Sequence, residues 1–394
     1  MIGISNMDAA GMNQPSIPQC NPKAAYQSQA SEIDSAIARV LRSGRYVLGP
    51  EVAAFEAEFA SYIGVPHALG VANGTDAITI ALKALDIGPG DVVLTVSHTA
   101  VATVVAIRTA GADPLFIDVE AETGLMDLTR LEELLALVRN GHAAIPLARI
   151  KAIIPVHLYG CGVDMDRLMG IANEYQLAVV EDCAQAHGAQ FDGRRVGSFG
   201  AFGCFSFYPT KNLGAIGDGG AVVTSDPRLL EKARLQREYG WRNRYISDTE
   251  GGNSRLDELQ AAVLRVKLSK LDADNNARVA IADTYRELIK HPAIKTPPQS
   301  KFIDPVYHQF VIRTQHRDQL KSYLQQQGIG TLVHYPVAIH LQPAYTAASF
   351  RIQPLPYTEQ WAQDVLSLPM FPQLDVRSVA YVAATINAWN GEAR

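Results

Sequence analysis

Residues 196–224 read VGSFGAFGCFSFYPTKNLGAIGDGGAVVT, and this stretch decides the fold. Two runs, FGCFSFYPT at 202–210 and GGAVVTS at 219–225, are expected to form strands that lie close together, and the Gly-rich loop that begins at Lys211 joins them. The loop is not a nucleotide motif, because GAIGDGG does not match G-x-G-x-x-G and precedes a strand. A lysine just after a buried strand can be desolvated, which lowers its pKa and favours a nucleophilic amine. Taken alone, the position also fits an ordinary surface lysine.

Upstream of this stretch, short apolar runs alternate with segments of helical periodicity. We expect strands at 92–96, 114–119, 152–160 and 177–182. We expect helices at 75–85, 101–111, 128–138 and 164–176. Fully apolar strands separated by helices of this length are typical of a sheet covered on both faces. The sequence therefore predicts an α/β domain with a mostly parallel sheet.

Downstream, residues 254–291 contain neither Gly nor Pro, and their leucines and valines repeat at helical spacing. Ser254 followed by Asp257 resembles a capping box, so we expect one long helix or two helices beginning at Ser254. Beyond Pro292 the signals are shorter, with a strand at 306–314 and a helix at 318–327. We therefore divide the chain into an N-terminal segment, a large α/β domain and a small C-terminal α+β domain, at 1–30, 31–269 and 270–394.

Composition excludes several classes of function. The 394 residues carry a net charge of -5 without a long Lys/Arg run, which argues against nucleic acid as the main partner. The four cysteines form no CxxC pair, so we expect no zinc site, no redox dithiol and no other metal. Without a signal peptide or a long apolar run, we expect a cytoplasmic protein that does not enter a membrane. Only 19% of the residues are charged, which hints at extra buried surface such as a subunit interface.

Three features of the predicted α/β domain could carry chemistry together. Asn73-Gly74-Thr75 precedes a helix, where backbone N–H groups suit a phosphate, although an ordinary N-cap has the same pattern. Asp182 ends a strand, where a carboxylate could pair with a cationic ring nitrogen or simply cap a helix. The third is Ser206 with Lys211, whose amine could bind an aldehyde. A phosphate cradle, a carboxylate and a lysine are the components of a pyridoxal phosphate site.

Four stretches resemble one protein family over long and specific motifs. They are residues 71–85 (VANGTDAITIALKAL), 181–189 (EDCAQAHGA), 196–224 and 251–268 (GGNSRLDELQAAVLRVKL). They are similar to the DegT/DnrJ/EryC1/StrS family of pyridoxal-phosphate sugar aminotransferases, from about Ile33 to the C-terminus. The resemblance implies fold type I, the aspartate aminotransferase fold, with a mostly parallel seven-stranded sheet. It also implies a homodimer with shared active sites, and glutamate as the amino donor that leaves as 2-oxoglutarate.

The resemblance also implies roles for individual residues. Lys211 matches the Schiff-base lysine, and Asp182 matches the partner of the pyridine nitrogen. Gln185 matches a residue near the ring oxygen of the cofactor. Asn253 matches an asparagine that reaches the phosphate of the neighbouring subunit's cofactor. The remaining phosphate contacts match Gly74, Thr75 and Ser206. The cofactor would be pyridoxal 5'-phosphate, with pyridoxamine 5'-phosphate as its form after the first half-reaction.

One position departs from the family pattern. Many relatives carry an aromatic residue that packs on the cofactor ring where this chain has Ala100. We expect that His98 takes that place, or else that it is an ordinary histidine at a strand end. His157, on the apolar run IIPVHLYG, we interpret as a core histidine, and Cys183 as a small packing residue.

The substrate is less clearly indicated. REYGWRNRYIS, KNLGAIGDGG and LVHYPVAIHLQPAY are more similar to the branch that acts on nucleotide-linked 3-keto-6-deoxyhexoses than to the 4-keto branch. A dTDP-linked sugar aminated at C3 is therefore expected. The candidates for the sugar-nucleotide pocket are Tyr239, Arg242, Tyr245 and His334. The alternatives are a 4-keto nucleotide sugar, a non-nucleotide keto substrate, or a pyridoxal-phosphate-binding regulator without turnover.

Overall fold

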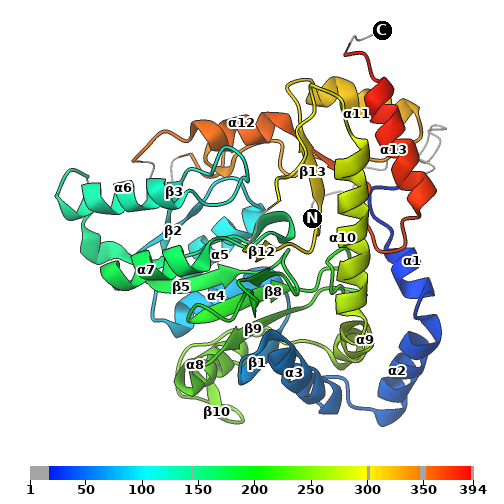
Figure 1. Ribbon diagram of the computed structural model, residues 1–394. Helices are drawn as coiled ribbons and strands as arrows, with labels where there is room; N and C mark the ends of the chain where they lie inside the picture. The colour runs from blue at the N-terminus through cyan, green and yellow to red at the C-terminus, as the bar shows by residue number, and fades with distance from the viewer. Residues whose placement is uncertain (1–16, 144, 300–301, 347–351, 392–394) are drawn as a thin grey trace.

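The computed structural model describes residues 17–391 except 144, 300–301 and 347–351. A central sheet and a smaller C-terminal group of elements make up the molecule (Figure 1). The helices are α1 (Pro22–Gln27), α2 (Ala30–Ser43), α3 (Pro50–Ile63), α4 (Gly74–Ala84), α5 (Val101–Ala110), α6 (Leu128–Arg139), α7 (Met165–Tyr175), α8 (Pro227–Arg237), α9 (Glu258–Leu268), α10 (Leu271–Leu288), α11 (Arg317–Gln326), α12 (Pro356–Asp364) and α13 (Val376–Ala388).

The central sheet has seven strands in the order β1-β9-β8-β5-β4-β2-β3. The strands are β1 (His67–Val71), β2 (Val92–Val96), β3 (Asp113–Ile117), β4 (Ile150–Ile153), β5 (Ala178–Asp182), β8 (Phe202–Ser206) and β9 (Gly220–Thr224). Only β9 runs antiparallel to its neighbours β8 and β1, so the sheet is mostly parallel. The predicted α/β class with a mostly parallel seven-stranded sheet is confirmed.

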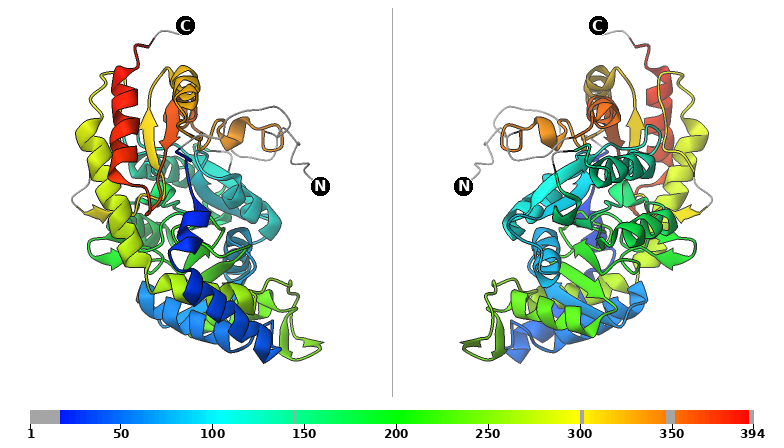
Figure 2. Two further views of the ribbon diagram at one scale, coloured as in Figure 1. Left: turned by 90° about the vertical axis from the view of Figure 1, so that its right-hand side faces the viewer. Right: turned by 90° about the vertical axis from the view of Figure 1, so that its left-hand side faces the viewer.

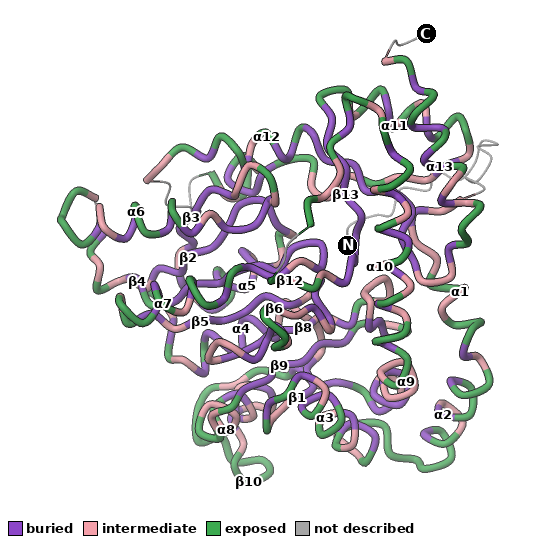
Figure 3. Tube along the Cα trace, in the orientation of Figure 1, coloured by how far each residue is buried: buried purple, intermediate pink, exposed green. Residues whose placement is uncertain are grey.

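Helices cover both faces of this sheet, as its fully apolar strands require. On one face, Val93, Val180 and Val222 pack in one apolar cluster with helices α4, α5 and α8. On the other face, Leu94 packs with α6 and α7, and Val223 packs with α3 and α9. The strands of the sheet are accordingly buried along most of their length (Figure 3). Ligands of such sheets bind at the carboxyl ends of the strands.

The C-terminal elements have an apolar core of their own. Strands β13 (Phe310–Arg313) and β14 (Val365–Leu368) pair antiparallel, and α10, α11 and α13 pack around them. The core includes Tyr285 of α10, whose ring lies 5.0 Å from that of Phe310. This α+β arrangement is the kind that the sequence predicts, while the exact boundary between 269 and 270 stays a prediction.

Smaller strands lie outside these two groups. They are β6 (Gln190–Phe191), β7 (Arg194–Arg195), β10 (Trp241–Asn243), β11 (Ile246–Ser247) and β12 (Ile303–Asp304). The β10–β11 hairpin projects from the lower end of the molecule, away from the C-terminal elements (Figures 1 and 2). Within the described residues, no helix is long and apolar enough to cross a membrane.

Several predicted elements are wrong in their bounds. The strand expected at 306–314 is only β13 (Phe310–Arg313), because Tyr307 turns the chain at φ 41°, and the strand expected at 202–210 ends with β8 at Ser206. The strand expected at 152–160 ends at Ile153, because Pro155 has no N–H for a ladder and Tyr159 and Gly160 turn the chain at φ 59° and 93°. The predicted helix at Ser254 begins at Glu258 instead. Ser254 is no cap: its hydroxyl donates to Asp76 at 2.6 Å and accepts from the N–H of Ala72. The long helical segment is two helices, α9 and α10.

Candidate active site at the carboxyl edge of the sheet

Asp182 is a buried carboxylate at the end of β5. It stands in register with Cys204 of the neighbouring strand β8, so its side chain lies at the carboxyl edge of the sheet. The hydroxyl of Thr103, on α5, donates to Oδ2 at 2.8 Å, and the N–H of Ala184 donates to Oδ1 at 3.1 Å. Burial raises the pKa of Asp182, and the nearby Lys211 amine partly offsets this rise. The site therefore holds a carboxylate that a cation would stabilise further.

Lys211 lies in the loop that follows β8, within electrostatic reach of Asp182. Desolvation lowers the pKa of Lys211 to about 8, because it outweighs the attraction to Asp182. At pH 7 about one amine in ten is then neutral, against fewer than about one in a thousand for an ordinary lysine. The environment thus produces the neutral amine that a nucleophile or base needs, as the sequence predicts for this position.

Three histidines lie within electrostatic reach of the Lys211 amine. Burial lowers the pKa of His187 to about 3 and the pKa of His334 to about 4, and it lowers the pKa of His308 well below its ordinary value. The Lys211 charge adds to each of these shifts. All three rings are therefore neutral near pH 7, and Asp182 is the charged group that opposes the lysine.

Gly74 and Ser206 meet where helix α4 begins. The Asn73 side chain caps the helix by accepting from the N–H of Asp76 at 2.8 Å. A Cβ on Gly74 would lie 2.7 Å from the Cβ of Ser206, so only glycine fits here. The first N–H groups of a helix have no intrahelical partner, and an anion can accept from them. Gly74, Thr75 and Ser206 therefore form a backbone-and-hydroxyl cradle of the kind that a phosphate needs.

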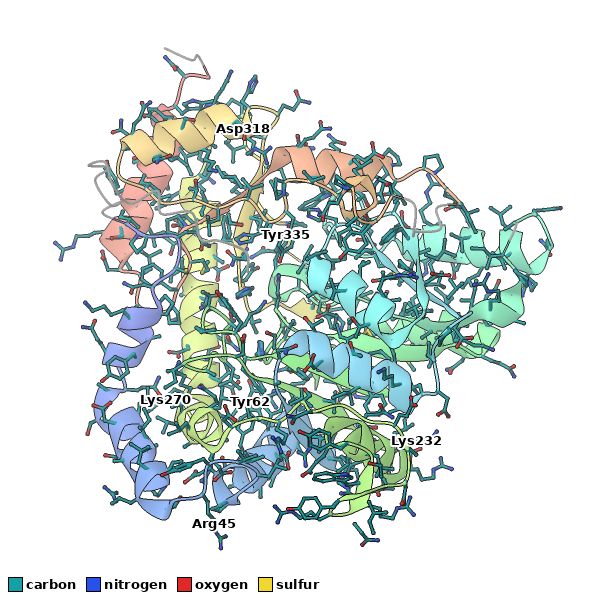
Figure 4. All side chains as sticks on the ribbon, turned by 180° about the vertical axis from the view of Figure 1, so that it is seen from behind. Arg45, Tyr62, Lys232, Lys270, Asp318 and Tyr335 are labelled. Carbon is teal, nitrogen blue, oxygen red and sulfur yellow. The ribbon has the colours of Figure 1, made fainter. Side chains whose placement is uncertain are left out.

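Gln185 and two tyrosines form another wall of the site. Gln185 Oε1 accepts from the backbone N–H of Tyr159 at 2.8 Å, and its Nε2 donates to the Tyr335 hydroxyl at 3.0 Å. Tyr335 lies between the C-terminal elements and the sheet (Figure 4). Within the part of the chain that the structure describes, the second Nε2 hydrogen of Gln185 has no acceptor, so it could donate to a ligand oxygen. The Tyr159 hydroxyl donates to the carbonyl of His334, which ties the C-terminal elements to this wall.

His98 is packed into the protein next to this wall. Its Nε2 lies 2.7 Å from the Tyr159 hydroxyl, and its ring lies 5.6 Å from that of Trp361. No interaction within the described residues joins His98 to Asp182 or Lys211. The ring is thus held by Tyr159 and Trp361, and the expectation that His98 stacks on a cofactor in place of an aromatic at Ala100 gains no support.

The other predicted substrate residues lie on or next to the β10–β11 hairpin, and no interaction within the described residues joins them to Lys211 of the same chain. Tyr239 and Tyr245 flank Trp241 with ring distances of 4.7 and 5.4 Å. Arg242 pairs with Asp248 at 3.3 Å. Asn253, just beyond the hairpin, is exposed and bridges to Glu238. Of the four predicted pocket residues, the structure brings only His334 to Lys211.

Three residues of the site were missed in the sequence: Thr103, Tyr159 and Tyr335. Thr103 could have been noticed as a hydroxyl within the apolar first half of α5, which reads VATVVAI. Tyr335 belongs to the quoted stretch LVHYPVAIHLQPAY, next to the predicted His334. Tyr159 lies in the part of the predicted strand 152–160 that is not a strand in the structure, and nothing in the neighbouring sequence marks it as a site residue.

His157, Glu181 and Cys183 form a second cluster of potential ligand atoms, all within 4.8 Å of one another. Glu181 accepts from the N–H groups of Gly197, Phe199 and Gly200 and lies 3.1 Å from His157 Nε2. The other His157 nitrogen accepts from the N–H of Val163. Because these donors already occupy the carboxylate and the ring, the cluster is a structural network, and His157 is the core histidine that the sequence predicts.

These groups fit pyridoxal phosphate. The buried carboxylate of Asp182 suits a protonated ring nitrogen, the low-pKa amine of Lys211 suits an aldehyde, and the Gly74–Ser206 cradle suits a phosphate. Gln185 adds an N–H that could donate to an oxygen on the ring. The residues thus match each polar part of that cofactor.

Comparisons with known proteins also indicate an aminotransferase. A sequence model of the DegT/DnrJ/EryC1/StrS aminotransferase family matches residues 27–387. The chain is 46% identical over 376 residues to the dTDP-3-amino-3,4,6-trideoxy-alpha-D-glucose transaminase of Streptomyces venezuelae, covering 95% of this chain and 96% of that protein. It is 45% identical over 358 residues to the dTDP-3-amino-3,6-dideoxy-alpha-D-galactopyranose transaminase of Aneurinibacillus thermoaerophilus, covering 91% and 95%. The crystal structure of S. venezuelae DesV with a ketimine intermediate matches with a TM-score of 0.90 and 46% identity, over 96% of this chain and 100% of that chain.

Proposed function

The chain belongs to the DegT/DnrJ/EryC1/StrS aminotransferase family, and from this membership we propose that it aminates C3 of a dTDP-linked 3-keto-6-deoxyhexose. Glutamate donates the amino group and leaves as 2-oxoglutarate, with pyridoxal phosphate as the cofactor. The names of the two transaminases reported above support C3 and dTDP, because both describe 3-amino sugars on that nucleotide.

One observation carries the aminotransferase chemistry: Lys211, with its pKa lowered to about 8, lies within electrostatic reach of the buried carboxylate of Asp182. A binding protein without turnover would need a site for the cofactor but no amine tuned to gain and lose a proton near neutral pH. This favours an enzyme over the regulator that the sequence leaves open.

When bound, pyridoxal phosphate supplies an aldehyde that links to amines and a ring that accepts electrons from the adjacent carbon. Asp182 would hold a proton on the ring nitrogen, and Thr103 and Ala184 keep that carboxylate oriented. Lys211 Nζ would take the proton from the substrate carbon and return it, since its amine is neutral for a useful fraction of the time. The Gly74–Ser206 cradle anchors the phosphate.

Large apolar side chains near the site are exposed in a single chain, which supports a homodimer with shared active sites. Tyr208 and Ile216, in the loop that carries Lys211, are exposed although both are large and apolar. Val101, at the start of α5, is exposed as well. A second subunit covering these residues would bring its own hairpin residues, with Arg242 and Asn253, to this site. Arg242 would then offer a guanidinium to the diphosphate of the nucleotide.

Two experiments test this function. Adding glutamate without sugar to the cofactor-loaded protein should convert the pyridoxal spectrum to the pyridoxamine spectrum; no conversion with any amino acid favours the regulator. Next, the pyridoxamine form is offered dTDP-3-keto, dTDP-4-keto and UDP-keto sugars, and a return of the pyridoxal spectrum reports turnover. Preference for a 4-keto sugar would contradict the assignment to C3.

A further inference from the structure

A chain of side-chain hydrogen bonds begins at Asn275, includes Asn212 next to Lys211, and ends at His308. Asn212, the residue after the lysine, donates from Nδ2 to Asn275 Oδ1 at 2.8 Å and to the carbonyl of Val306 at 3.0 Å. Its Oδ1 lies 3.2 Å from His308 Nδ1. Asn275 in turn donates from Nδ2 to the carbonyl of His187 at 2.8 Å. The mechanism proposed above uses none of these side chains.

The direction of this chain of hydrogen bonds follows from its two backbone carbonyls, which can only accept. Because Asn275 Nδ2 faces the carbonyl of His187, its Oδ1 faces Asn212 and must receive a hydrogen. Asn212 therefore presents Nδ2 to Asn275 and to Val306, and it presents Oδ1 to His308. The proton between Asn212 and His308 must then reside on Nδ1 of the histidine.

The surroundings keep this ring in a single protonation state. His308 is buried, and both burial and the charges of Lys211 and Arg278 lower its pKa well below the ordinary value. A neutral imidazole carries one N–H, so with Nδ1 protonated the opposite nitrogen keeps its lone pair. The ring holds Asn212 without placing a second cation beside the lysine.

The consequence for Lys211 is mechanical. Asn212 is clamped by α10 through Asn275, by the segment before β13 through Val306, and by His308. These three contacts fix the backbone position next to the lysine. A shift of about 1 Å at a reacting group can lower a rate by about 100-fold, so such a clamp is relevant to catalysis.

We propose that His308 is a positioning residue for Lys211: its Nδ1 proton holds Asn212, and Asn212 fixes the loop that carries the reacting amine. The proposal rests on the proposed function in one respect, that Lys211 is that amine. A role as a plain core residue would require only that the ring fill space.

Two substitutions separate these roles, because Asn and Gln each imitate one edge of the imidazole. In His308→Asn the amide can donate from near the Nδ1 position, whereas in His308→Gln it lies near the Nε2 position and Asn212 loses its donor. We expect H308N to keep kcat within about 3-fold of wild type and H308Q to lower kcat by about 10- to 100-fold. KM for glutamate and for the sugar should stay within about 3-fold in both variants, since the proposed clamp acts on the position of Lys211 and not on the binding of substrate.

A second readout needs neither cofactor nor turnover. In the cofactor-free protein, the rate at which an acylating reagent modifies Lys211 is followed against pH by peptide mass spectrometry. Wild type and H308N should show a midpoint near pH 8, and H308Q should shift it upward because a looser loop exposes the amine to water. Asp182, His187, His334 and Arg278, the other groups that bear on the amine or on His308, are unchanged in each variant.

The results of these two experiments distinguish a positioning role of His308 from a space-filling role. If H308Q matches wild type in kcat and midpoint, or if H308N is as impaired as H308Q, the clamp is refuted. If H308Q does not fold, Asn212→Ala removes the same hydrogen bond and must produce the same loss of kcat and the same shift. If wild type transfers no amino group, the proposed function fails, and the midpoints alone still decide the role of His308.

Discussion

Removing the Thr103 hydroxyl should weaken cofactor binding by an amount that the structure lets us work out. Thr103 is fully buried and donates to Asp182 Oδ2 at 2.8 Å, so Thr103→Val keeps the shape and deletes one hydrogen bond to a carboxylate. Such bonds contribute about 1.5–3 kcal/mol. Since about 1.4 kcal/mol is tenfold, pyridoxal phosphate should bind about 10- to 100-fold more weakly.

The effect has a defined electrostatic cause. With only Ala184 left as a donor, the pKa of Asp182, already raised by burial, rises further, and the carboxylate is less available to a protonated ring nitrogen. The assay is a titration of cofactor-free protein followed by absorbance, with Thr103→Ser as the variant that retains the hydroxyl. Thr99→Val is the matched control, because the Thr99 hydroxyl lies 3.2 Å from the Thr103 hydroxyl and, within the described residues, makes no hydrogen bond to the carboxylate. Wild-type affinity in T103V, or equal losses in T103V and T99V, would refute this reasoning.

Three further predictions concern stability, pH and assembly. Glu258 is buried on α9 and accepts from the N–H groups of Gly49, Glu51 and Val52 at the start of α3, so Glu258→Ala should lower the free energy of unfolding, measured in urea, by about 3 kcal/mol. Glu250→Ala, at an exposed position, is the control. If it lowers the free energy of unfolding equally, Glu258 does not cap α3. The pKa of Lys211 falls from 10.5 in the unfolded chain to about 8 in the folded protein, so the unfolded chain binds more protons between pH 8 and 10.5. The free energy of unfolding should therefore rise with pH across that window, by up to about 3 kcal/mol more in cofactor-free wild type than in Lys211→Met. Equal slopes of unfolding free energy against pH in the two proteins would contradict the lowered pKa. Asn253→Ala and Lys211→Ala should each be inactive as homodimers yet regain activity when mixed, because one site in the hybrid is intact; no recovery would contradict shared sites.

Local patterns predicted most of the fold, because the signals for a helix or a buried strand lie within a few neighbouring residues. Strand β2 at 92–96 and the end of β5 at Asp182 lie where the apolar runs place them. The errors occur where one residue overrides the pattern. Pro155 ends β4 early, and Ser254 bonds to Asp76, 178 positions away, rather than to its own helix.

The sequence predicted candidate site residues that lie in recognisable local motifs. It missed those that reach the site only through the packing of distant elements. Asp182 could be predicted from its place at a strand end and Lys211 from its place in the loop after a buried strand, and the structure brings the two within electrostatic reach of each other. The partnership of Thr103 with Asp182 spans 79 positions and depends on how α5 packs against the end of β5. Similarly, the imidazole of His98 could stack on a cofactor ring as far as the sequence shows. Its contacts with Tyr159 and Trp361, which lie far away in the sequence, form only in the folded chain.

The central claim is that Lys211 drives amino transfer from glutamate to C3 of a dTDP-linked keto sugar. The most direct measurement supplies ¹⁵N-glutamate and a dTDP-3-keto-6-deoxyhexose to the cofactor-loaded protein and locates the label in the product by NMR. We predict ¹⁵N on C3 with wild type and no labelled sugar with Lys211→Ala. Label on C4 of a 4-keto sugar only, or labelled product from the Lys211→Ala variant at the wild-type rate, would contradict the account.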